Sequence, residues 1–486
     1  MERLILVRLG SELTLKSRRT RYMFLQRLRR NLEDALASAG LKHRVSEQWG
    51  RMYVRAESPA ALSLISRVFG ISSCSLIEGE VPARIDTIVE RGQQLFRERV
   101  AGRRFAVRTH RVGQHDFRSH DIDVQLGAAL LPLAAGVDLG HPEVTVHVEI
   151  RADQAYLFSQ RTQASGGLPI GVEGRAVALV SGGYDSAVAA WLMLKRGVEL
   201  DYVFCNLGGA AYERAVVHVA KALAEDWSYG TRPKLHVIDF AECLRELRAT
   251  VRSNYLQVVL KRLMYRSAAA ISHQHKAIAI VTGEAIGQVS SQTLHNLRAI
   301  EPASDLPVLR PLLGFDKEEI IARARAIGTA ALSEQVKEYC AIAPGKPVTA
   351  TTPERIAQEE APFPLAVLEQ AIAQRKVLDL RALNATDLAA PYLFTTSIPD
   401  GAIVIDCRPE PQYQAWHMPG SIQREEWDLL HEFKRLDKNR KYVLYCAHGI
   451  QTAYLAEKMQ NAGFEAYSFR GGLKNIMRYA ERQENP

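Results

Sequence analysis

The sequence has few cysteines, and none has the spacing of a structural metal site. The six cysteines form no C-x-x-C pair and lie at positions 74, 205, 243, 340, 407 and 446. This spacing argues against structural zinc and against a disulfide-stabilised secreted fold. No apolar run reaches the ~18 residues of a membrane span, and LILV near the start is too short and charge-flanked for a signal peptide. We therefore expect a cytoplasmic protein with reduced thiols and no membrane association.

The chain carries more positive than negative charge, and the surplus is unevenly placed. Its 486 residues exceed what one core accommodates, so we expect three or four domains. The net charge is +8, with seven basic residues between Lys16 and Arg30 and eight arginines between Arg91 and Arg118. Solvated helix faces explain some of these, but the clustering in the first third also indicates a polyanionic partner.

The order of the predicted elements divides the chain. An arginine-rich α+β unit comes first, and a region of mixed helices and strands follows from about 60 to 165. From 175 onward an open parallel sheet is predicted by helix-length segments between strands near 176–180, 200–205, 234–239 and 277–282. Five prolines between Pro344 and Pro364 indicate a linker. A last α/β block begins at Ile403.

The stretch VALVSGGYDS, residues 177–186, joins a predicted strand to a predicted helix that ends before Gly197. Two glycines allow backbone amides to approach a ligand, and the helix start adds unpaired N–H groups, so the turn suits a phosphate. Asp185 inside the turn suits a magnesium ion bridging to phosphates. The alternative is a capped strand-to-helix turn without a ligand.

Three further segments lie where such a site would form. The turn IVTGEAIGQVSSQT contains Gly283, which would allow close backbone approach, and Gln288 and Gln292, whose amides suit a nucleotide or base. Lys261 lies in a largely apolar helix and either reaches solvent or a phosphate. In FDKEEI, Asp316 and Glu319 form a capping box. A lysine in the first turn opposes the helix dipole, so Lys317 indicates a nearby anion.

Cys446 lies at a second reactive turn, in the C-terminal block. It follows the predicted strand KYVLY and precedes CAHGIQT and a helix, so loop amides and the helix start would stabilise a thiolate or persulfide. Burial as a small apolar side chain is the alternative, and we favour it for Cys74, Cys243 and Cys407. The role of Cys205, at the end of a strand of the parallel sheet, stays open.

These motifs together resemble a known family. SGGYDS is similar to the PP-loop of ATP pyrophosphatases, the series IDCR, HMPG and CAHGIQT to a rhodanese domain, and the module with FAVRTHRVGQHDFRSHDID and GGLPIG to a THUMP RNA-binding domain. In this order, with TGEAIGQVSSQTLHNL and RPLLGFDKEEI between them, they resemble the tRNA 4-thiouridine synthase family, also called tRNA uridine 4-sulfurtransferases. The resemblance covers nearly the whole chain.

The resemblance implies a multidomain α/β and α+β fold. The expected parts are a ferredoxin-like domain at 1–58, a THUMP domain at 59–165, a PP-loop adenylation domain at 172–343, a proline-rich linker at 344–398 and a rhodanese-like domain at 399–486.

The family's functional residues map onto this sequence one by one. Asp185 would be needed for adenylation and Lys317 for activity, Cys446 would carry the persulfide, and Cys340 would be its redox partner in a Cys340–Cys446 disulfide. Gln451 departs from many rhodaneses, which have arginine there, so a protein sulfur donor is favoured over free thiosulfate. The implied ATP-binding residues are Leu179, Val180, Ser181, Gly182, Gly183, Asp185, Ser186, Lys261, Gly283 and Gln292.

The implied reaction uses ATP and Mg²⁺ to adenylate uridine at tRNA position eight, and sulfur from Cys446 then replaces the activated oxygen. The implied partners are tRNA, a cysteine desulfurase and a sulfur-carrier protein of thiamine synthesis. In the THUMP-like module we expect Arg103, Arg104, Arg108 and Arg111 to contact tRNA phosphates. Two alternatives remain: an RNA-binding protein with a degenerate ATP site, and a PP-loop amide ligase acting on a small molecule.

Overall fold

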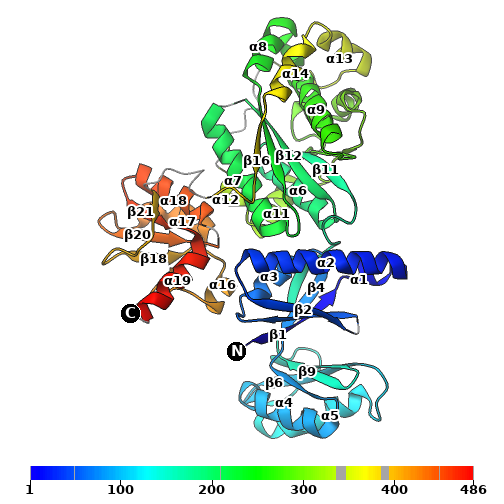
Figure 1. Ribbon diagram of the computed structural model, residues 1–486, viewed down its shortest axis with the longest axis vertical. Helices are drawn as coiled ribbons and strands as arrows, with labels where there is room; N and C mark the ends of the chain where they lie inside the picture. The colour runs from blue at the N-terminus through cyan, green and yellow to red at the C-terminus, as the bar shows by residue number, and fades with distance from the viewer. Residues whose placement is uncertain are drawn as a thin grey trace. The chain divides into compact units, whose positions relative to one another are not determined.

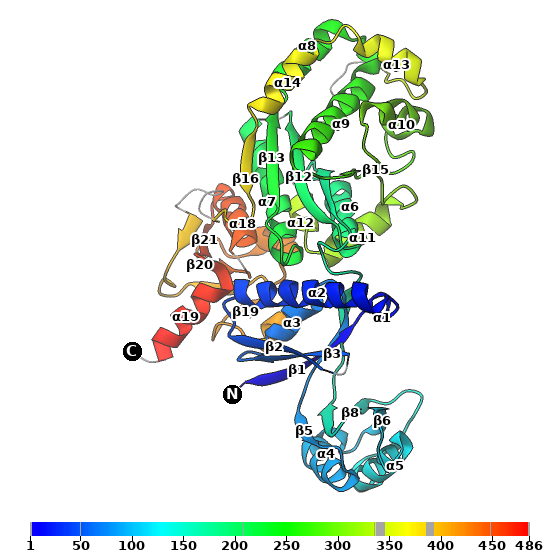
Figure 2. The same cartoon turned by 45° about the vertical axis from the view of Figure 1, so that its right-hand side comes forward.

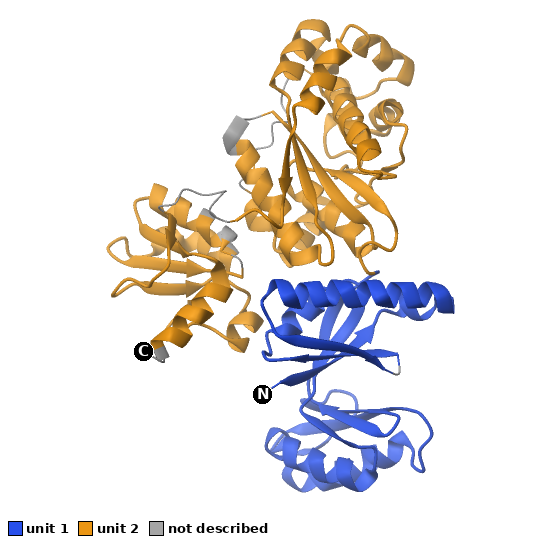
Figure 3. Cartoon of the chain, viewed as in Figure 1, with its two compact units in different colours: residues 1–168 blue, residues 169–486 orange. Residues whose placement is uncertain are grey.

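The computed structural model describes residues 2–48, 50–207, 209–334, 336, 346–384, 393–447 and 449–484. The chain forms two compact units, Met1–Leu168 and Pro169–Pro486 (Figure 3). Cys340, which we expected to be a redox partner, lies outside the described residues. Among the described residues, no helix combines the length and apolar character that crossing a membrane requires.

The first unit begins with a five-stranded antiparallel sheet in the order β10-β4-β1-β3-β2. Helix α2 (Arg18–Ser38) buries Leu25, Leu28 and Leu32, spaced as one face of a helix. The elements of this part are β1 (Arg3–Leu9), α1 (Ser11–Thr14), α2, β2 (His43–Gln48), β3 (Arg51–Ala56), α3 (Ala61–Arg67), β4 (Ile71–Leu76) and β10 (Thr162–Gly166). The sheet therefore extends beyond the expected 1–58, because β4 and β10 complete it.

The second sheet of this unit has the order β5-β9-β8-β6-β7, and α4 and α5 cover one of its faces (Figure 1). Phe105 and Val107 of β6 alternate toward that helix-covered face and are buried there. Its elements are β5 (Gly79–Pro82), α4 (Ile85–Val100), β6 (Arg104–Val112), α5 (Ser119–Leu130), η1 (Leu131–Leu133), β7 (Gly136–Val137), β8 (Val144–Arg151) and β9 (Gln154–Phe158).

The second unit contains the predicted open parallel sheet, in the order β15-β14-β11-β12-β13-β16. All neighbouring pairs are parallel except β13 with β16. Helices α8, α9 and α14 pack on one face, and α6 and α7 lie on the other, where Trp191 meets Trp227 edge to face. Figure 2 shows the sheet between these helices.

The elements of this domain are β11 (Arg175–Leu179), α6 (Tyr184–Lys195), β12 (Glu199–Asn206), α7 (Gly209–Trp227), β13 (Lys234–Asp239), α8 (Ala241–Thr250), η2 (Ser253–Tyr255), α9 (Leu256–Gln274), β14 (Ile280–Val281), η3 (Ser290–Gln292), α10 (Leu294–Ile300), η4 (Glu301–Ala303), β15 (Val308–Leu309), α11 (Lys317–Ala326) and α12 (Ala330–Ser333).

The proline-rich segment is not a loose linker in its described part. Residues 346–384 include α13 (Pro353–Glu360), α14 (Leu365–Ala373) and β16 (Lys376–Asp379). Strand β16 pairs antiparallel with β13, and Ile356, Leu368 and Ile372 join the core of the parallel sheet. Pro353 begins α13, where proline is tolerated because its missing N–H has no helical partner. The linker prediction is therefore wrong for these residues.

The C-terminal block is a second parallel sheet, in the order β17-β21-β20-β18-β19. Its central strand β20 (Lys441–Tyr445) is buried from Tyr442 onward. The other elements are β17 (Phe394–Thr395), β18 (Ile403–Asp406), α16 (Glu410–Ala415), β19 (Ile422–Gln423), α17 (Glu426–Glu432), η6 (Phe433–Arg435), α18 (Ile450–Asn461), β21 (Glu465–Phe469) and α19 (Gly472–Glu484). The expected multidomain α/β and α+β fold is confirmed.

Candidate active site

The turn after β11 has the geometry expected of an anion-binding loop. Gly182 has a φ of +78°, and a Cβ there would lie 2.9 Å from Cγ2 of Val336 and 3.0 Å from Cγ2 of Val216. Gly183 caps α6, and the Ser186 hydroxyl accepts from Ser181 N at 3.2 Å and donates to Gly183 O at 3.1 Å. The loop is therefore closed by its own side chains, and the first turn of α6 keeps unpaired N–H groups.

Gly283 is required by the protein's own backbone. A Cβ at this position would lie 2.6 Å from both the carbonyl carbon of Asp185 and the amide nitrogen of Ser186. These distances exclude any side chain, because backbone atoms cannot move aside as a flexible side chain can. The turn after β14 therefore lies directly against the start of α6.

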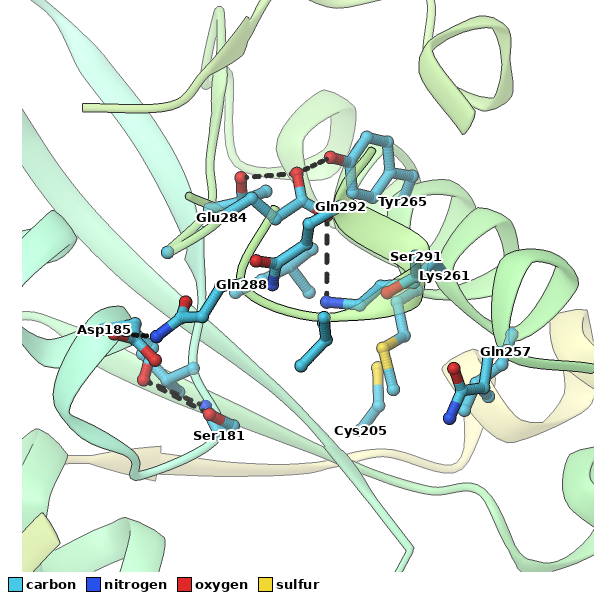
Figure 4. Close-up of a pocket in the computed structure, with 18 of the residues that line it drawn as sticks. Ser181, Asp185, Cys205, Gln257, Lys261, Tyr265, Glu284, Gln288, Ser291 and Gln292 are labelled. Carbon is cyan, nitrogen blue, oxygen red and sulfur yellow. Dashed lines mark hydrogen bonds and ion pairs between the residues drawn. The ribbon is translucent and has the colours of Figure 1, made fainter. Parts of the chain in front are cut away.

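Two side chains donate hydrogen bonds to the Asp185 carboxylate. Lys317 Nζ, at the start of α11, lies 3.1 Å from Oδ1 and 3.0 Å from Oδ2 of Asp185. Gln288 Nε2 donates to Asp185 Oδ1 at 3.3 Å (Figure 4). The capping box of Asp316 and Glu319 is present and fixes the start of α11. The sequence predicted an anion beside Lys317. In the structure, the Asp185 carboxylate is an anion at that position.

Asp185, Gln288 and Lys317 line a pocket of about 720 Å³. Its apolar part suits the flat face of a nucleobase, and Lys261 and Lys317 provide positive charge for phosphates. Cys205 belongs to the apolar part, is 6% exposed, and has a pKa raised by burial, which disfavours a thiolate. The residues of the apolar part are Leu179, Phe204, Cys205, Leu207, Leu260 and Met264.

A buried carboxylate lies in the wall of this pocket. Glu284 is 2% exposed and accepts from Thr282 Oγ1 and Arg310 Nε, each at 3.0 Å, and from the Tyr265 hydroxyl. Lys261 Nζ lies 3.7 Å from its Oε1 (Figure 4). Burial by itself would raise the pKa of Glu284, but Lys261, the Tyr265 hydroxyl and Arg310 lower it below its usual value.

The predicted ATP-binding residues therefore converge on one pocket. Gln292 is 8% exposed, and its Oε1 accepts from Ala285 N at 3.3 Å. Sequence reasoning missed Glu284, Tyr265 and Arg310, although Glu284 directly follows Gly283. The predicted Gly182 and Gly183 belong to the turn but not to the pocket wall, and the predicted residues of the wall are Leu179, Val180, Ser181, Asp185, Ser186, Lys261, Gly283, Gln288, Gln292 and Lys317.

A magnesium ion that accompanies ATP would fit at Asp185. The carboxylate provides the oxygen ligands that Mg²⁺ prefers, with phosphate oxygens completing the set. The Lys317 ammonium contacts both oxygens of that carboxylate. Lys317 and the ion would therefore compete for Asp185.

A cluster of Asp201, His236 and His275 brings three potential metal ligands within 4.8 Å of one another. Arg375 Nε donates to Nδ1 of His236 at 3.2 Å, so the neutral ring carries its proton on Nε2. That nitrogen then has no lone pair for a metal. Burial lowers the pKa of His236 to about 3, and nearby cations act in the same direction. The cluster fits a buried polar contact better than a metal centre.

Cys446 lies at the carboxyl end of β20, as predicted. It is 2% exposed, and Gly449 N donates to its Sγ at 3.2 Å. The Thr452 hydroxyl lies 3.6 Å from the same sulfur and 2.8 Å from the Ser468 hydroxyl. Gly449, with a φ of +82°, precedes α18. A backbone amide, a hydroxyl and a helix start therefore surround the thiol.

The IDCR motif contains a buried ion pair between Asp406 and Arg408. Arg408 donates to both oxygens of Asp406, at 2.9 Å from Nε to Oδ1 and 2.6 Å from Nη2 to Oδ2. Both side chains are buried, and Arg408 Nη2 also donates to Trp416 O at 2.6 Å. Cys407 is buried as expected, and its pKa is raised by burial. The motif therefore has a structural role at the end of β18, the strand that pairs with β20 before Cys446.

The four arginines expected to bind RNA do not share one surface. Arg104 and Arg108 project from the same face of β6, because strand side chains alternate, and Arg103 is exposed just before it. Arg108 lines a recess of about 270 Å³ with Arg8, Arg51 and Arg161. Arg111 alternates to the other face, where its Nη1 lies 3.1 Å from Nδ1 of His115.

Comparison with known families agrees with this arrangement. Residues 4–75 match the "ThiI ferredoxin-like domain", 82–160 the "THUMP domain", 171–365 the "Thiamine biosynthesis protein (ThiI)" family and 393–478 the "Rhodanese-like domain". The fold and site therefore define an ATP-pyrophosphatase-like domain joined to a THUMP module and a rhodanese-like domain.

Relatives extend over almost the whole chain. A tRNA sulfurtransferase of Pyrobaculum aerophilum is 36% identical, covering 96% of each chain. One of Desulfurococcus amylolyticus is 37% identical, covering 96% of this chain and 97% of the relative. A solved 4-thiouridine synthetase in complex with RNA and ATP is 33% identical with a TM-score of 0.69, covering 78% of this chain and 99% of that chain. The chain belongs to the tRNA sulfurtransferase family of enzymes, which confirms the resemblance.

Proposed function

We propose that this protein makes 4-thiouridine at position eight of tRNA, using ATP to activate the uridine and Cys446 to deliver sulfur. The observation that carries the proposal is the pairing of two sites in one chain. One is a pocket in which Asp185, Lys317 and Lys261 surround a phosphate-binding turn. The other is a thiol surrounded by the Gly449 amide and the Thr452 hydroxyl.

The first step is adenylation of the uridine. Oxygen 4 attacks the α-phosphorus of ATP, the bond to pyrophosphate breaks, and the N3 proton of uridine leaves to solvent. The turn 181–186 and Lys261 hold the phosphates, and Lys317 stabilises charge on the departing pyrophosphate. Mg²⁺ held at Asp185 would neutralise phosphate charge. Activation is needed because a carbonyl oxygen is a poor leaving group.

The second step is sulfur transfer. The outer sulfur of a Cys446 persulfide attacks carbon 4, and AMP leaves with the oxygen. A thiolate at Cys340 then attacks the sulfur of Cys446, which releases 4-thiouridine and leaves a Cys340–Cys446 disulfide. An external dithiol reduces that disulfide and restores both thiols. The Gly449 amide suits a persulfide anion on Cys446, because an N–H donor stabilises negative charge.

The remaining partners follow from the same chemistry. The tRNA is held through its phosphates by arginines of the first unit, including Arg104 and Arg108. A cysteine desulfurase loads Cys446, and the same persulfide supplies a sulfur-carrier protein of thiamine synthesis. We propose the cytoplasm as the site of the reaction, because tRNA and these partners would be available there.

The proposal is tested by measuring pyrophosphate release with and without tRNA, together with mass spectrometry of the tRNA nucleosides. We expect release to need tRNA and the nucleoside product to be 4-thiouridine at position eight. Pyrophosphate release driven by a small amine or acid, without tRNA, would instead identify an amide ligase. Binding of tRNA without any pyrophosphate release would identify a non-catalytic RNA-binding protein.

A further inference from the structure

The amide of Gln288 is held in one orientation at the ATP pocket. Its nitrogen donates to Asp185 Oδ1 at 3.3 Å (Figure 4). A carboxylate only accepts hydrogen bonds, so the nitrogen end of the amide must face Asp185. If the amide were flipped, the side-chain oxygen of Gln288 would face a carboxylate oxygen of Asp185, and the two would repel each other. Lys317 contacts both oxygens of this carboxylate, and a carboxylate that binds a metal ion instead still only accepts hydrogen bonds, so it faces the nitrogen end of the amide in either case.

The side-chain oxygen of Gln288 is available to accept a hydrogen bond. Gln288 lies in the pocket wall and is half-buried. Within the described part of the chain, its side-chain oxygen has no hydrogen-bond partner. A half-buried acceptor of fixed direction beside the phosphate-binding turn suits a ligand that presents an N–H group.

The segment around Gln288 and its neighbour across a backbone hydrogen bond carry exposed apolar side chains, which we call the apolar lip: Ile286, Val289 and Leu313. They are 49%, 39% and 37% exposed. Ile286 N donates to Leu313 O at 3.4 Å, so the two segments lie side by side, and Val289 lines the pocket. Exposed apolar side chains beside a ligand pocket indicate a ligand with an apolar face. A base removed from its stack in RNA has such a face.

We propose that Gln288 reads the N3–H group of the target uridine, while the apolar lip contacts the face of the unstacked base. This inference rests on the proposed function. Uridine presents a donor at N3, which pairs with the Gln288 oxygen. Cytidine presents a lone pair at N3, which that oxygen repels. Gln288 therefore selects uridine through an orientation that the Asp185 carboxylate imposes.

The same contact assists the adenylation. As oxygen 4 attacks phosphorus, the ring gains positive charge and N3–H becomes a stronger donor. The hydrogen bond to Gln288 is then stronger in the transition state than in the bound substrate, which is the condition for accelerating a step. The oxygen–phosphorus bond forms and the bond to pyrophosphate breaks. The N3 proton leaves to water afterwards, so Gln288 need not accept it.

A double-mutant cycle tests the contact. Single-turnover pyrophosphate release is measured for wild type and Gln288→Ala, each with tRNA carrying uridine or 3-deazauridine at the target position. 3-Deazauridine has a C–H group in place of N3–H. We expect Gln288→Ala to slow release about tenfold or more with uridine, and less than about threefold with 3-deazauridine, because no hydrogen bond is then lost. The affinities for ATP and tRNA should stay within about twofold of wild type, because the contact forms with the base alone.

Gln257→Ala is the matched control. Gln257 lines the same pocket, and its Oε1 accepts from the Ser290 hydroxyl at 2.8 Å. Its replacement should affect both substrates by the same factor. Equal slowing of both substrates by Gln288→Ala would overturn the inference while leaving the proposed function intact. A wild-type enzyme that releases no pyrophosphate with uridine tRNA would overturn the proposed function itself.

Discussion

At the scale of single residues, Asp185 is the group on which we expect adenylation to depend. We predict that Asp185→Asn lowers pyrophosphate release at least about 100-fold, because the carboxylate charge that Lys317 and a metal ion contact is lost. The affinity for tRNA should be nearly unchanged, because the arginines expected to hold phosphates lie elsewhere. Both quantities are checked by a coupled pyrophosphate assay and by filter binding at fixed salt.

Asp316→Asn is the control for that experiment. Asp316 directly precedes Lys317 and caps α11 by accepting from Glu319 N at 2.8 Å. Asparagine caps helices about as well as aspartate, so this variant should keep wild-type pyrophosphate release. Normal release by Asp185→Asn would show that the carboxylate has no role in adenylation.

The residues of this site differ in how far the sequence could reveal them. The turn SGGYDS is local, so its glycines and hydroxyls predict its geometry without any knowledge of the tertiary fold. Gly283 lines the pocket, but the structure requires glycine for a different reason than ligand approach, since backbone atoms of Asp185 and Ser186 exclude a side chain. Glu284 could not be assigned, because its partners Tyr265 and Arg310 come from separate elements.

At the scale of elements, Glu149 of β8 connects three strands of the first unit. It pairs with Arg8 of β1 at 2.8 Å and Arg51 of β3 at 2.9 Å, and with Arg151 of β8 at 2.8 Å. Burial opposes ionisation, but the arginines outweigh it and lower the pKa of Glu149 to about 2. This carboxylate therefore stabilises the unit above its unfolded pKa of about 4.3. The stabilisation is lost as the pH falls toward about 2.

We predict that Glu149→Gln lowers the free energy of unfolding of the first unit by about 3–5 kcal/mol at pH 7, because buried arginines lose their partner. The variant should also lose the decline in stability that wild type shows between about pH 4.3 and pH 2. Urea unfolding of the full chain, followed by hydrogen exchange of the β1 and β8 amides, measures both effects. Glu33→Gln, which breaks the exposed pair with Arg29, should change stability by less than about 1 kcal/mol. An equal effect of the two variants would contradict the prediction.

Strand β6 carries the second prediction at this scale. We expect Arg104→Gln and Arg108→Gln each to lower the log–log salt slope of tRNA binding by about one unit, as loss of one phosphate contact should. Arg103→Gln should do the same if it also contacts phosphate. Arg111, on the opposite face and beside His115, is the contrast and should leave the slope unchanged. Unchanged slopes for Arg103, Arg104 and Arg108 would place the tRNA on another surface.

The boundaries of elements were harder to predict than the elements themselves. The alternation of strands and helices after residue 175 predicted the parallel sheet, because period and length are local signals. Proline content misidentified residues 346–384 as a linker, since Pro353 begins α13 and Pro364 caps α14. The pairing of β16 with β13 is a contact between distant parts of the sequence. A local sequence pattern therefore does not predict it.

At the scale of the whole molecule, the proposed reaction couples two chemistries that lie in different sheets. Adenylation belongs to the pocket beside β11 and β14, and sulfur transfer belongs to the loop after β20. The described chain includes Cys74, Cys205, Cys243, Cys407 and Cys446, all of them buried. Burial raises the pKa of Cys74 to about 12 and that of Cys243 to about 11, which disfavours either as an attacking thiolate.

Cys340 is therefore the residue we expect to resolve the persulfide, on the basis of the family resemblance. We predict that Cys340→Ser still accepts a persulfide on Cys446 and still adenylates tRNA, because neither step needs a second thiol. Its first sulfur transfer should stop with the base joined to Cys446 through the transferred sulfur, because no Cys340 thiolate is there to release 4-thiouridine. Multiple-turnover assays with mass spectrometry of the nucleosides measure this directly.

Cys243→Ser is the matched control, since it removes a buried thiol from the same domain and should leave repeated turnover near the wild-type rate. In wild type, turnover without a reductant should accumulate a Cys340–Cys446 disulfide that peptide mass mapping detects. The disulfide forms because the attacking thiolate displaces the product sulfur from Cys446, so one disulfide should appear for each 4-thiouridine made. Repeated turnover by Cys340→Ser at the wild-type rate would contradict the resolving role and would require an external thiol to release the product.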